Sequence, residues 1–406
     1  MATTIDVPRS DVKVIGLVCG AHMLSHVYML LLPPLFPQLR DHFGVGFLEL
    51  GLIVTAFNLA SALTQAPMGF LVDRLGARTL LIAGLSIEGA CFAAIGLVPQ
   101  FWMVIALATL AGVANSVYHP CDYTILNASV AKERMGRAFS AHTFAGYLGF
   151  AAAPVAMLAL ERVIGWQGAL MVGGGSGLVM AMILLVQGAV LQDRANAAAA
   201  ARKEEGGKRG IAMLLTMPIL MSFLFYVLQS MSNTGVTTFS VSALSILDKV
   251  TFEQATFILS LYLASSAGGV LVGGWLADKT SRHDLVSAGT YLTYGGLVAL
   301  IGLGASGPVA IGVLLVIAGL ASGINAPSRD MMVRAAAPAG AVGAVFGFVS
   351  VGFNVGGLIA PSMYGAMMDY GNPGFVFFGV AAASALCVVT VLQNGAIRRR
   401  RAAVAT

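Results

Sequence analysis

Twelve long apolar runs constrain what this chain can fold into. A transmembrane helix uses about 20 mostly apolar residues, and each run is long enough to cross a bilayer. Hydrophobic residues make up 58% of the 406 residues and charged residues only 10%, so little polar surface is left to face water. This balance excludes a soluble enzyme, a nucleic-acid-binding protein and a disordered chain. The predicted spans are 13–37, 47–72, 79–98, 101–127, 136–160, 167–191, 211–243, 253–277, 284–304, 308–333, 341–367 and 374–395.

The runs are apolar throughout, whereas the strands of an outer-membrane barrel alternate apolar and polar residues. The predicted fold class is therefore an all-α integral membrane protein with twelve transmembrane helices. The only long polar linker divides them into two sets of six. We predict an N-terminal six-helix bundle over 1–191, a linker over 192–210 and a C-terminal six-helix bundle over 211–406.

The basic residues predict the orientation in the membrane. With the N-terminus, the linker and the C-terminal arginines on one side, that side holds twenty of the 23 Lys and Arg residues. The other side holds only Arg40, Arg162 and Lys249. Cytoplasmic loops carry the excess of Lys and Arg in membrane proteins. We therefore expect a multi-pass protein of a bacterial-type inner membrane with both termini in the cytoplasm.

The two halves repeat each other. The segment Gly112–Pro120 matches Gly319–Pro327 at an offset of 207 residues. An offset of 205 takes Gly69 and Asp73 to Gly274 and Asp278. Two six-helix repeats with the same orientation are typical of secondary transporters. The lack of a Walker A segment indicates secondary coupling, and the lack of a Gly-x-Ser-x-Gly elbow argues against an enzyme.

The loop after the second span, Gly69-Phe-Leu-Val-Asp73-Arg74-Leu-Gly76-Ala-Arg78, resembles the signature of the major facilitator superfamily. Gly274-Trp-Leu-Ala-Asp278-Lys279-Thr-Ser-Arg282 resembles a degraded copy. The resemblance implies two bundles that alternate access to a central cavity. It also implies a gating role for these two loops. The predicted gating residues are Gly69, Asp73, Arg74, Gly76, Arg78, Asp278 and Lys279.

A narrower resemblance is to the fosmidomycin-resistance type of efflux protein. It rests on His22, on the segment Phe57–Gly69 and on Ser116-Val-Tyr118-His119-Pro120. That group tends to carry an acid four residues after the first-span His, where this chain has His26. It also tends to carry an acid after the His-Pro pair, where this chain has Cys121 followed by Asp122. The resemblance implies proton-driven export of a drug or metabolite.

Ionisable residues inside spans cost about 2.5–3.5 kcal/mol each and usually face a cavity or a partner. An imidazole has an unperturbed pKa near 6.5, so it can gain and lose a proton near neutral pH. His22 and His26 share one helix face, and Asp122 shares another with His119. Glu88 in the third span is a further suspect. The predicted proton-coupling residues are His22, His26, His119, Asp122 and His142.

Polar residues of spans 4, 7, 10 and 11 are the predicted lining of the substrate cavity. The 207-residue offset also maps Asp122 onto Arg329, which predicts an ion pair that gates the pathway. Pairing of Arg329 with Asp330 is not expected, because consecutive helix residues point about 100° apart. The predicted cavity residues are Asn115, Tyr118, Gln229, Asn233, Asn325, Arg329 and Asn354.

The functional prediction is a proton-coupled transporter that exports a small organic molecule. It requires no cofactor beyond the proton, and its expected partners are the substrate and the bilayer, with no nucleic acid, for a chain that acts as a monomer. One alternative is import of a small organic anion with Arg329 as counter-ion. A second is transport of a transition metal, because His22, His26, His119 and Asp122 offer suitable ligands. A non-transporting sensor is the least favoured.

Overall fold

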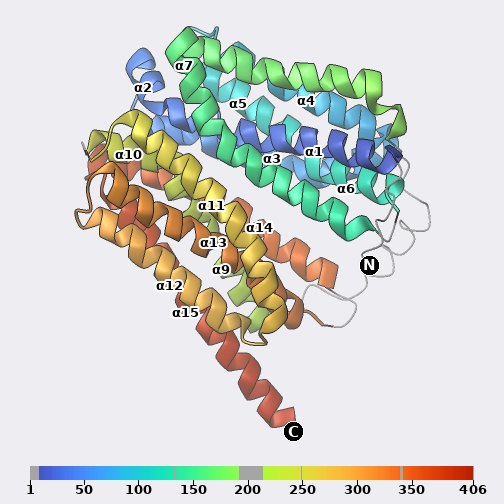
Figure 1. Ribbon diagram of the computed structural model, residues 1–406, viewed down its shortest axis with the longest axis vertical. Helices are drawn as coiled ribbons and strands as arrows, with labels where there is room; N and C mark the ends of the chain where they lie inside the picture. Colours follow the sequence, from blue (N-terminus) through green and yellow to red (C-terminus); the bar gives the residue numbers. More distant parts are fainter. Residues whose placement is uncertain (1–8, 132–133, 192–213, 248, 339–341, 406) are drawn as a thin grey trace, which may run out of the picture. The chain divides into compact units, whose positions relative to one another are not determined.

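The computed structural model describes residues 9–131, 134–191, 214–247, 249–338 and 342–405. Every long element in these ranges is a helix (Figure 1). The expected linker over 192–210 lies outside the described residues. The helices are α1 (Arg9–Met29), α2 (Phe36–Phe43), α3 (Phe47–Leu75), α4 (Ala77–Ile95), α5 (Phe101–Asn115), α6 (Tyr118–Ser129), α7 (Met135–Gln187), α9 (Met217–Thr234), α10 (Ser240–Ile246), α11 (Phe252–Lys279), α12 (His283–Gly302), α13 (Pro308–Ala336), α14 (Val342–Tyr370) and α15 (Phe375–Ala405).

Eleven stretches of the described chain are long and apolar enough to cross a membrane. One of them, Ala138–Val190, has 53 residues. A straight helix of that length would extend about 80 Å, far beyond the roughly 30 Å of a bilayer core. Gly165 resolves the discrepancy, because its φ of 71° and ψ of 169° break α7 into two spans. The described residues therefore contain the twelve spans that the sequence predicts.

The fourth predicted span, 101–127, is not one continuous helix. Helix α5 ends at Asn115, and α6 begins at Tyr118. A proline has no N–H, and its ring clashes with the carbonyl four residues before it. For Pro120 that carbonyl belongs to Ser116, so the helix opens one turn upstream of the proline. This break places His119 and Asp122 in the first two turns of a new helix.

The first and seventh spans are also irregular. The first was predicted to run to residue 37, but α1 ends at Met29 and the prolines of a short 3-10 turn, Pro33–Leu35, separate it from α2. The seventh passes from α9 through a π-helical turn, Gly235–Phe239, into α10. Both predicted spans exist, and in each the regular helix is shorter than the apolar run.

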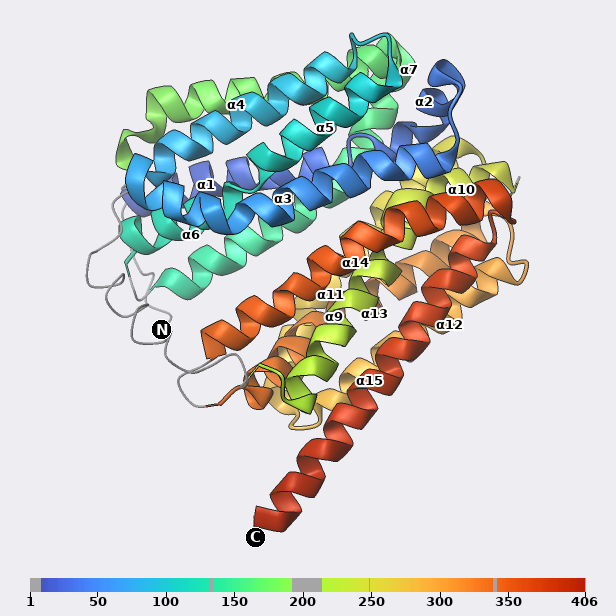
Figure 2. The ribbon, with the colours of Figure 1, turned by 180° about the vertical axis from the view of Figure 1, so that it is seen from behind.

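The chain forms two compact units. The first unit contains Met1–Leu32 and Ala56–Ala200, and the second contains Pro33–Thr55 and Ala201–Thr406. In the first unit, α7 packs along both α1 and α4 (Figure 1). In the second unit, α9 packs against α14 and α15 (Figure 2). Helix α3 contributes its first residues to the second unit and the remainder to the first.

Asp369, at the end of α14, caps the N-terminus of α3 within the second unit. The amides of Phe47 and Leu48 donate to its two carboxylate oxygens at 2.9 and 2.6 Å. These amides belong to the first turn of α3, where no backbone acceptor is available. A negative charge there also interacts favourably with the positive end of the helix dipole.

Candidate functional site

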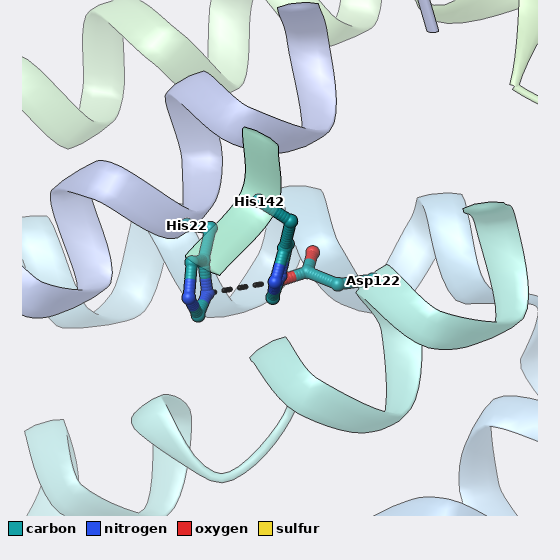
Figure 3. Close-up of side chains that lie close together, drawn as sticks. All are labelled: His22, Asp122 and His142. Atoms are coloured by element: carbon teal, nitrogen blue, oxygen red, sulfur yellow. Dashed lines mark hydrogen bonds and ion pairs between the residues drawn. The ribbon is translucent and has the colours of Figure 1, made fainter. Parts of the chain in front are cut away.

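The carboxylate of Asp122 is the centre of the polar cluster in the first unit. Asp122 lies in the second turn of α6 and is fully buried. His142 Nε2, from α7, lies 3.0 Å from Asp122 Oδ2 in a hydrogen bond. His22 Nδ1, from α1, lies 3.2 Å from the same oxygen (Figure 3). Three helices therefore bring two imidazoles to one carboxylate oxygen, and both rings are buried.

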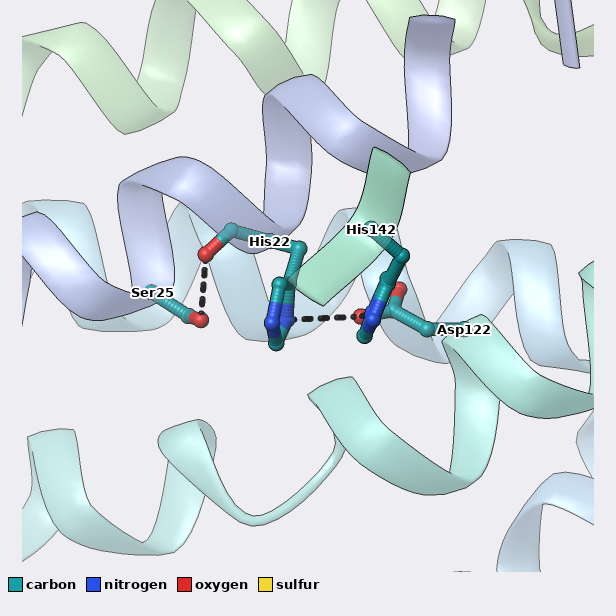
Figure 4. A network of polar contacts seen from close by, with 4 residues as sticks. All are labelled: His22, Ser25, Asp122 and His142. Carbon is teal, nitrogen blue, oxygen red and sulfur yellow. Dashed lines mark hydrogen bonds and ion pairs between the residues drawn. The ribbon is translucent and has the colours of Figure 1, made fainter. Parts of the chain in front are cut away.

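The two imidazole contacts differ in kind. His142 makes an aligned hydrogen bond, whereas His22 Nδ1 lies at ion-pair distance without the alignment of a hydrogen bond. Ser25 does not bond the His22 ring, because its hydroxyl donates to the backbone carbonyl of His22 at 2.7 Å (Figure 4). A positive charge on the His22 imidazole would strengthen this contact.

Close packing of α1 on α7 places the rings together. The rings of His22 and His142 are stacked, with centroids 3.6 Å apart and planes 21° apart. Glycines permit this approach: a Cβ on Gly149 would lie 2.2 Å from the carbonyl oxygen of Met23. A Cβ on Gly146 would lie 2.9 Å from Nε2 of His22. Small residues commonly allow such close helix contacts in membranes.

The other two predicted imidazoles lie beside this pair. The His26 ring contacts His22 edge-on at 4.6 Å and Phe150 at 4.2 Å. His119 is exposed, and its ring centroid lies 5.3 Å from that of His22. The sequence therefore predicted the neighbourhood of all five residues. It could not separate the buried trio of His22, Asp122 and His142 from the two flanking rings.

In the second unit, Arg329 is the central charged group. Its Nη1 donates to Gln229 Oε1 at 3.2 Å, which links α13 to α9. Its Nε donates to Asp330 Oδ1 at 2.8 Å. The expectation that Arg329 would not pair with Asp330 is wrong, because the long arginine side chain bends back to its neighbour. Tyr226 donates to the same Asp330 oxygen at 3.1 Å.

Comparison with known proteins identifies the family of this twelve-span chain. The sequence model described as Major Facilitator Superfamily matches residues 18–284 and 228–403, which together span most of the chain. The chain belongs to the major facilitator superfamily. It is accordingly a multi-pass membrane transporter, not an enzyme.

Relatives within the superfamily include efflux proteins. The fosmidomycin resistance protein of Escherichia coli (strain K12) is 24% identical over 384 residues, covering 89% of this chain and 88% of the relative. The multi-drug resistance efflux pump PmrA of Streptococcus pneumoniae serotype 4 is 24% identical, covering 90% and 91%. A bacterial homologue of the human lysosomal transporter Spinster has a similar fold, with a TM-score of 0.75, 13% identity and 95% coverage of both chains.

The superfamily signature has one well-defined contact among the described residues. Arg78 Nη2 donates to the carbonyls of Leu184 and Leu185 at 3.3 and 3.0 Å, at the end of α7. Cations are favourable at this end of a helix, where carbonyls lack amide partners. Gly76 adopts a φ of 88°, which favours glycine between α3 and α4. Gly69 is half-buried, Arg74, Asp278 and Lys279 are exposed, and the side chain of Asp73 lies outside the described part.

The remaining predicted cavity residues lie in different surroundings. Asn115 Nδ2 donates to the buried carboxylate of Glu88 at 3.1 Å, and Tyr118 is buried in the core of the first unit. Asn233 is exposed and accepts a bond from Tyr262 at 3.4 Å, while Asn354 is half-buried. Asn325 is fully buried, and its amide atoms have no hydrogen-bond partner among the described residues. A common substrate cavity for these residues stays a prediction.

Sequence reasoning missed the aromatic partners of Arg329 and wrongly rejected its acidic partner, Asp330. The guanidinium carbon lies 4.9 Å from the centre of the Tyr226 ring and 5.4 Å from that of Phe353. It also missed the ion pair of Arg134 with Asp11, at 2.9 Å. The only signal in the sequence for these contacts was the scarcity of charged residues, because a buried or half-buried charge in a membrane protein usually has a partner.

Proposed function

We propose that this chain is a proton-coupled secondary transporter whose proton site is the trio of His22, Asp122 and His142. The observation that carries the proposal is the shared oxygen Asp122 Oδ2, approached by two imidazoles inside an apolar bundle. A buried carboxylate needs a compensating charge, and a neutral imidazole supplies only a dipole. A proton from solution can supply that charge.

His22 is the proton carrier in this proposal, and His142 positions the carboxylate. With a proton on Nε2, His142 donates to Asp122 both as a neutral and as a charged imidazole. The contact of His22 becomes strongly favourable only when its ring is charged, because it lacks hydrogen-bond alignment. His119 is exposed and its ring lies 5.3 Å from that of His22, so we assign to it the passage of protons between His22 and the protein surface.

The stacking of the two rings favours one proton at a time. Two charged imidazoles with centroids 3.6 Å apart would repel by about 5 kcal/mol at an effective dielectric constant of 20. One imidazolium beside one carboxylate leaves the buried site neutral. We therefore assign one proton to each filling of the site.

Ring geometry favours a proton over a transition metal at this site. The ligand atoms of His22, Asp122 and His142 lie within 4.8 Å of one another, as a metal site would require. However, a ligating nitrogen directs its lone pair in the plane of its ring. The two rings are stacked with centroids 3.6 Å and planes 21° apart, so a single ion about 2 Å from both nitrogens cannot lie in both ring planes.

The direction we propose is export, across a bacterial-type inner membrane, with both termini in the cytoplasm. The twenty-to-three distribution of Lys and Arg supports the cytoplasmic termini. The two relatives whose names describe resistance or efflux support export. We propose that the two conformations bind the proton with different affinities. Filling and emptying of the proton site would then bias the alternation between them.

A test that needs no substrate is the charge movement after a pH jump. Purified protein in liposomes on a solid-supported membrane should give a transient current when external protons enter the buried site. Asp122→Asn keeps the size of the side chain and removes its charge, so the current should be lost. Asp41→Asn, on exposed α2, is the matched control and should keep it. A normal current in Asp122→Asn would refute the assignment.

A further inference from the structure

The two units carry equivalent polar pairs at equivalent positions. Adding 207 to His22 and Asp122 gives Gln229 and Arg329. His22 Nδ1 lies 3.2 Å from Asp122 Oδ2, and Arg329 Nη1 lies 3.2 Å from Gln229 Oε1. The repeat has therefore kept the contact and changed its chemistry. The first unit has a titratable pair with a negative group, whereas the second has a permanent positive charge.

Aromatic rings support the guanidinium of Arg329. It lies over Tyr226 and Phe353, whose rings pack edge-to-face with centroids 4.6 Å apart. Guanidinium groups stack favourably on such faces. The amide oxygen of Gln229 holds the edge of the guanidinium, and the two aromatic rings contact its face. Together these contacts fix the orientation of the guanidinium. The positive charge of Arg329 is therefore held in one orientation against two aromatic rings.

The carboxylate that neutralises Arg329 is half-exposed and also accepts a hydrogen bond from Tyr226. The Asp330 side chain is 47% exposed, whereas that of Arg329 is only 15% exposed. A half-exposed ion pair contributes roughly 0–1 kcal/mol, because water competes for the carboxylate. The anion in contact with Arg329 is therefore accessible from the surface, and the cation beneath it is fixed. An arriving carboxylate could replace Asp330 by taking over its contacts with Arg329 and Tyr226.

We propose that Arg329 binds the anionic group of a small organic anion, and that the Asp330 carboxylate occupies that place in the unliganded protein. The place accommodates one carboxylate, and the half-buried ring of Phe353 offers apolar surface beside it, whereas Tyr226 is buried. The ligand class is a small monocarboxylate with an apolar body. This inference rests on the proposed function, because it makes the transported substrate an anion.

The experiment measures ligand-induced thermal stabilisation of the purified full-length protein in nanodiscs of zwitterionic lipid, which exclude anionic headgroups. The probes are acetate and benzoate, each beside its neutral analogue, acetamide or benzamide. A ligand that binds only the folded state raises the Tm with concentration. We expect at least one anion to raise the Tm of the wild type while its amide does not.

Three variants separate an anion site from a structural ion pair. Arg329→Gln should weaken the anion's affinity roughly tenfold to a hundredfold, because it removes charge-assisted hydrogen bonds. Asp330→Asn should tighten it about two- to fivefold, because the internal competitor is lost. Arg334→Gln, exposed on the same helix, should leave it unchanged. A purely structural pair predicts no gain in Asp330→Asn.

The inference is overturned if neither anion raises the Tm of the wild type, if the effect survives in Arg329→Gln, or if Asp330→Asn does not bind the anion more tightly. The pH-jump current of the wild type, measured on the same preparation, keeps the two proposals apart. A normal current without anion binding refutes the anion site alone. Anion binding without a current refutes the proton site and leaves Arg329 as an anion-binding group.

Discussion

His22 Nδ1 lies 3.2 Å from Asp122 Oδ2, and this contact joins α1 to α6 without the alignment of a hydrogen bond. A contact of this kind is weak when the imidazole is neutral and strong when it is charged. His142 makes the aligned bond to the same oxygen at 3.0 Å. The two rings that share Asp122 should therefore respond differently to replacement.

His22→Gln should abolish the pH-jump current, because the amide cannot take up a proton. His142→Gln should keep a measurable part of it, because the amide can still donate to Asp122 while His22 remains titratable. His42→Gln, on exposed α2, is the control and should behave like the wild type. Equal losses in His22→Gln and His142→Gln would contradict the division of roles. The current amplitude at matched protein density is the measurement.

Gly149→Ala should disturb the same site through the backbone. The added Cβ would lie 2.2 Å from the carbonyl oxygen of Met23, so α7 must move away from α1. Overpacking of this kind costs about 1–3 kcal/mol of folding free energy. The shift would also separate the rings of His22 and His142, so we expect a lower Tm together with a smaller proton current.

Gly175→Ala is the matched control for this substitution, because it lies on α7 and its Cβ meets nothing within 4 Å. It should keep both the Tm and the current of the wild type. If both glycine variants behave alike, the close approach of α1 and α7 does not hold the site together.

Asp369→Ala should destabilise the second unit. It removes both acceptors for the amides of Phe47 and Leu48 at the start of α3. Loss of a helix cap costs about 0.5–2 kcal/mol. Asp369→Asn should lose less, since the amide oxygen can still accept one bond. The Tm of the two variants beside Asp41→Ala is the measurement, and an unchanged Tm in Asp369→Ala would show that the cap contributes nothing.

The sequence was sufficient for the architecture because apolar length and charge distribution follow directly from the bilayer. It was also sufficient to single out the group of His22, His26, His119, Asp122 and His142, because a buried charge in a membrane helix is costly and rare, but it could not separate the buried trio from the two flanking rings. It could not give the stacking of His22 on His142, since that depends on how α1 and α7 rotate against each other. The expectation for Arg329 failed for a related reason: helix geometry fixes Cβ directions, but a long flexible side chain can depart from them.

Orientation in the membrane is a further expectation from the sequence, and two short loops beside α12 can test it. Ser281, before α12, should face the cytoplasm, and Ser306, after it, should face the outside. Both are exposed, and Ser→Cys changes little in size. In a variant lacking the four native cysteines, a membrane-impermeant maleimide added to intact cells should label Ser306→Cys and not Ser281→Cys. Permeabilising the membrane should make Ser281→Cys reactive. The reverse pattern would place the termini outside, because a single span separates the two positions and the basic residues assign them to opposite sides.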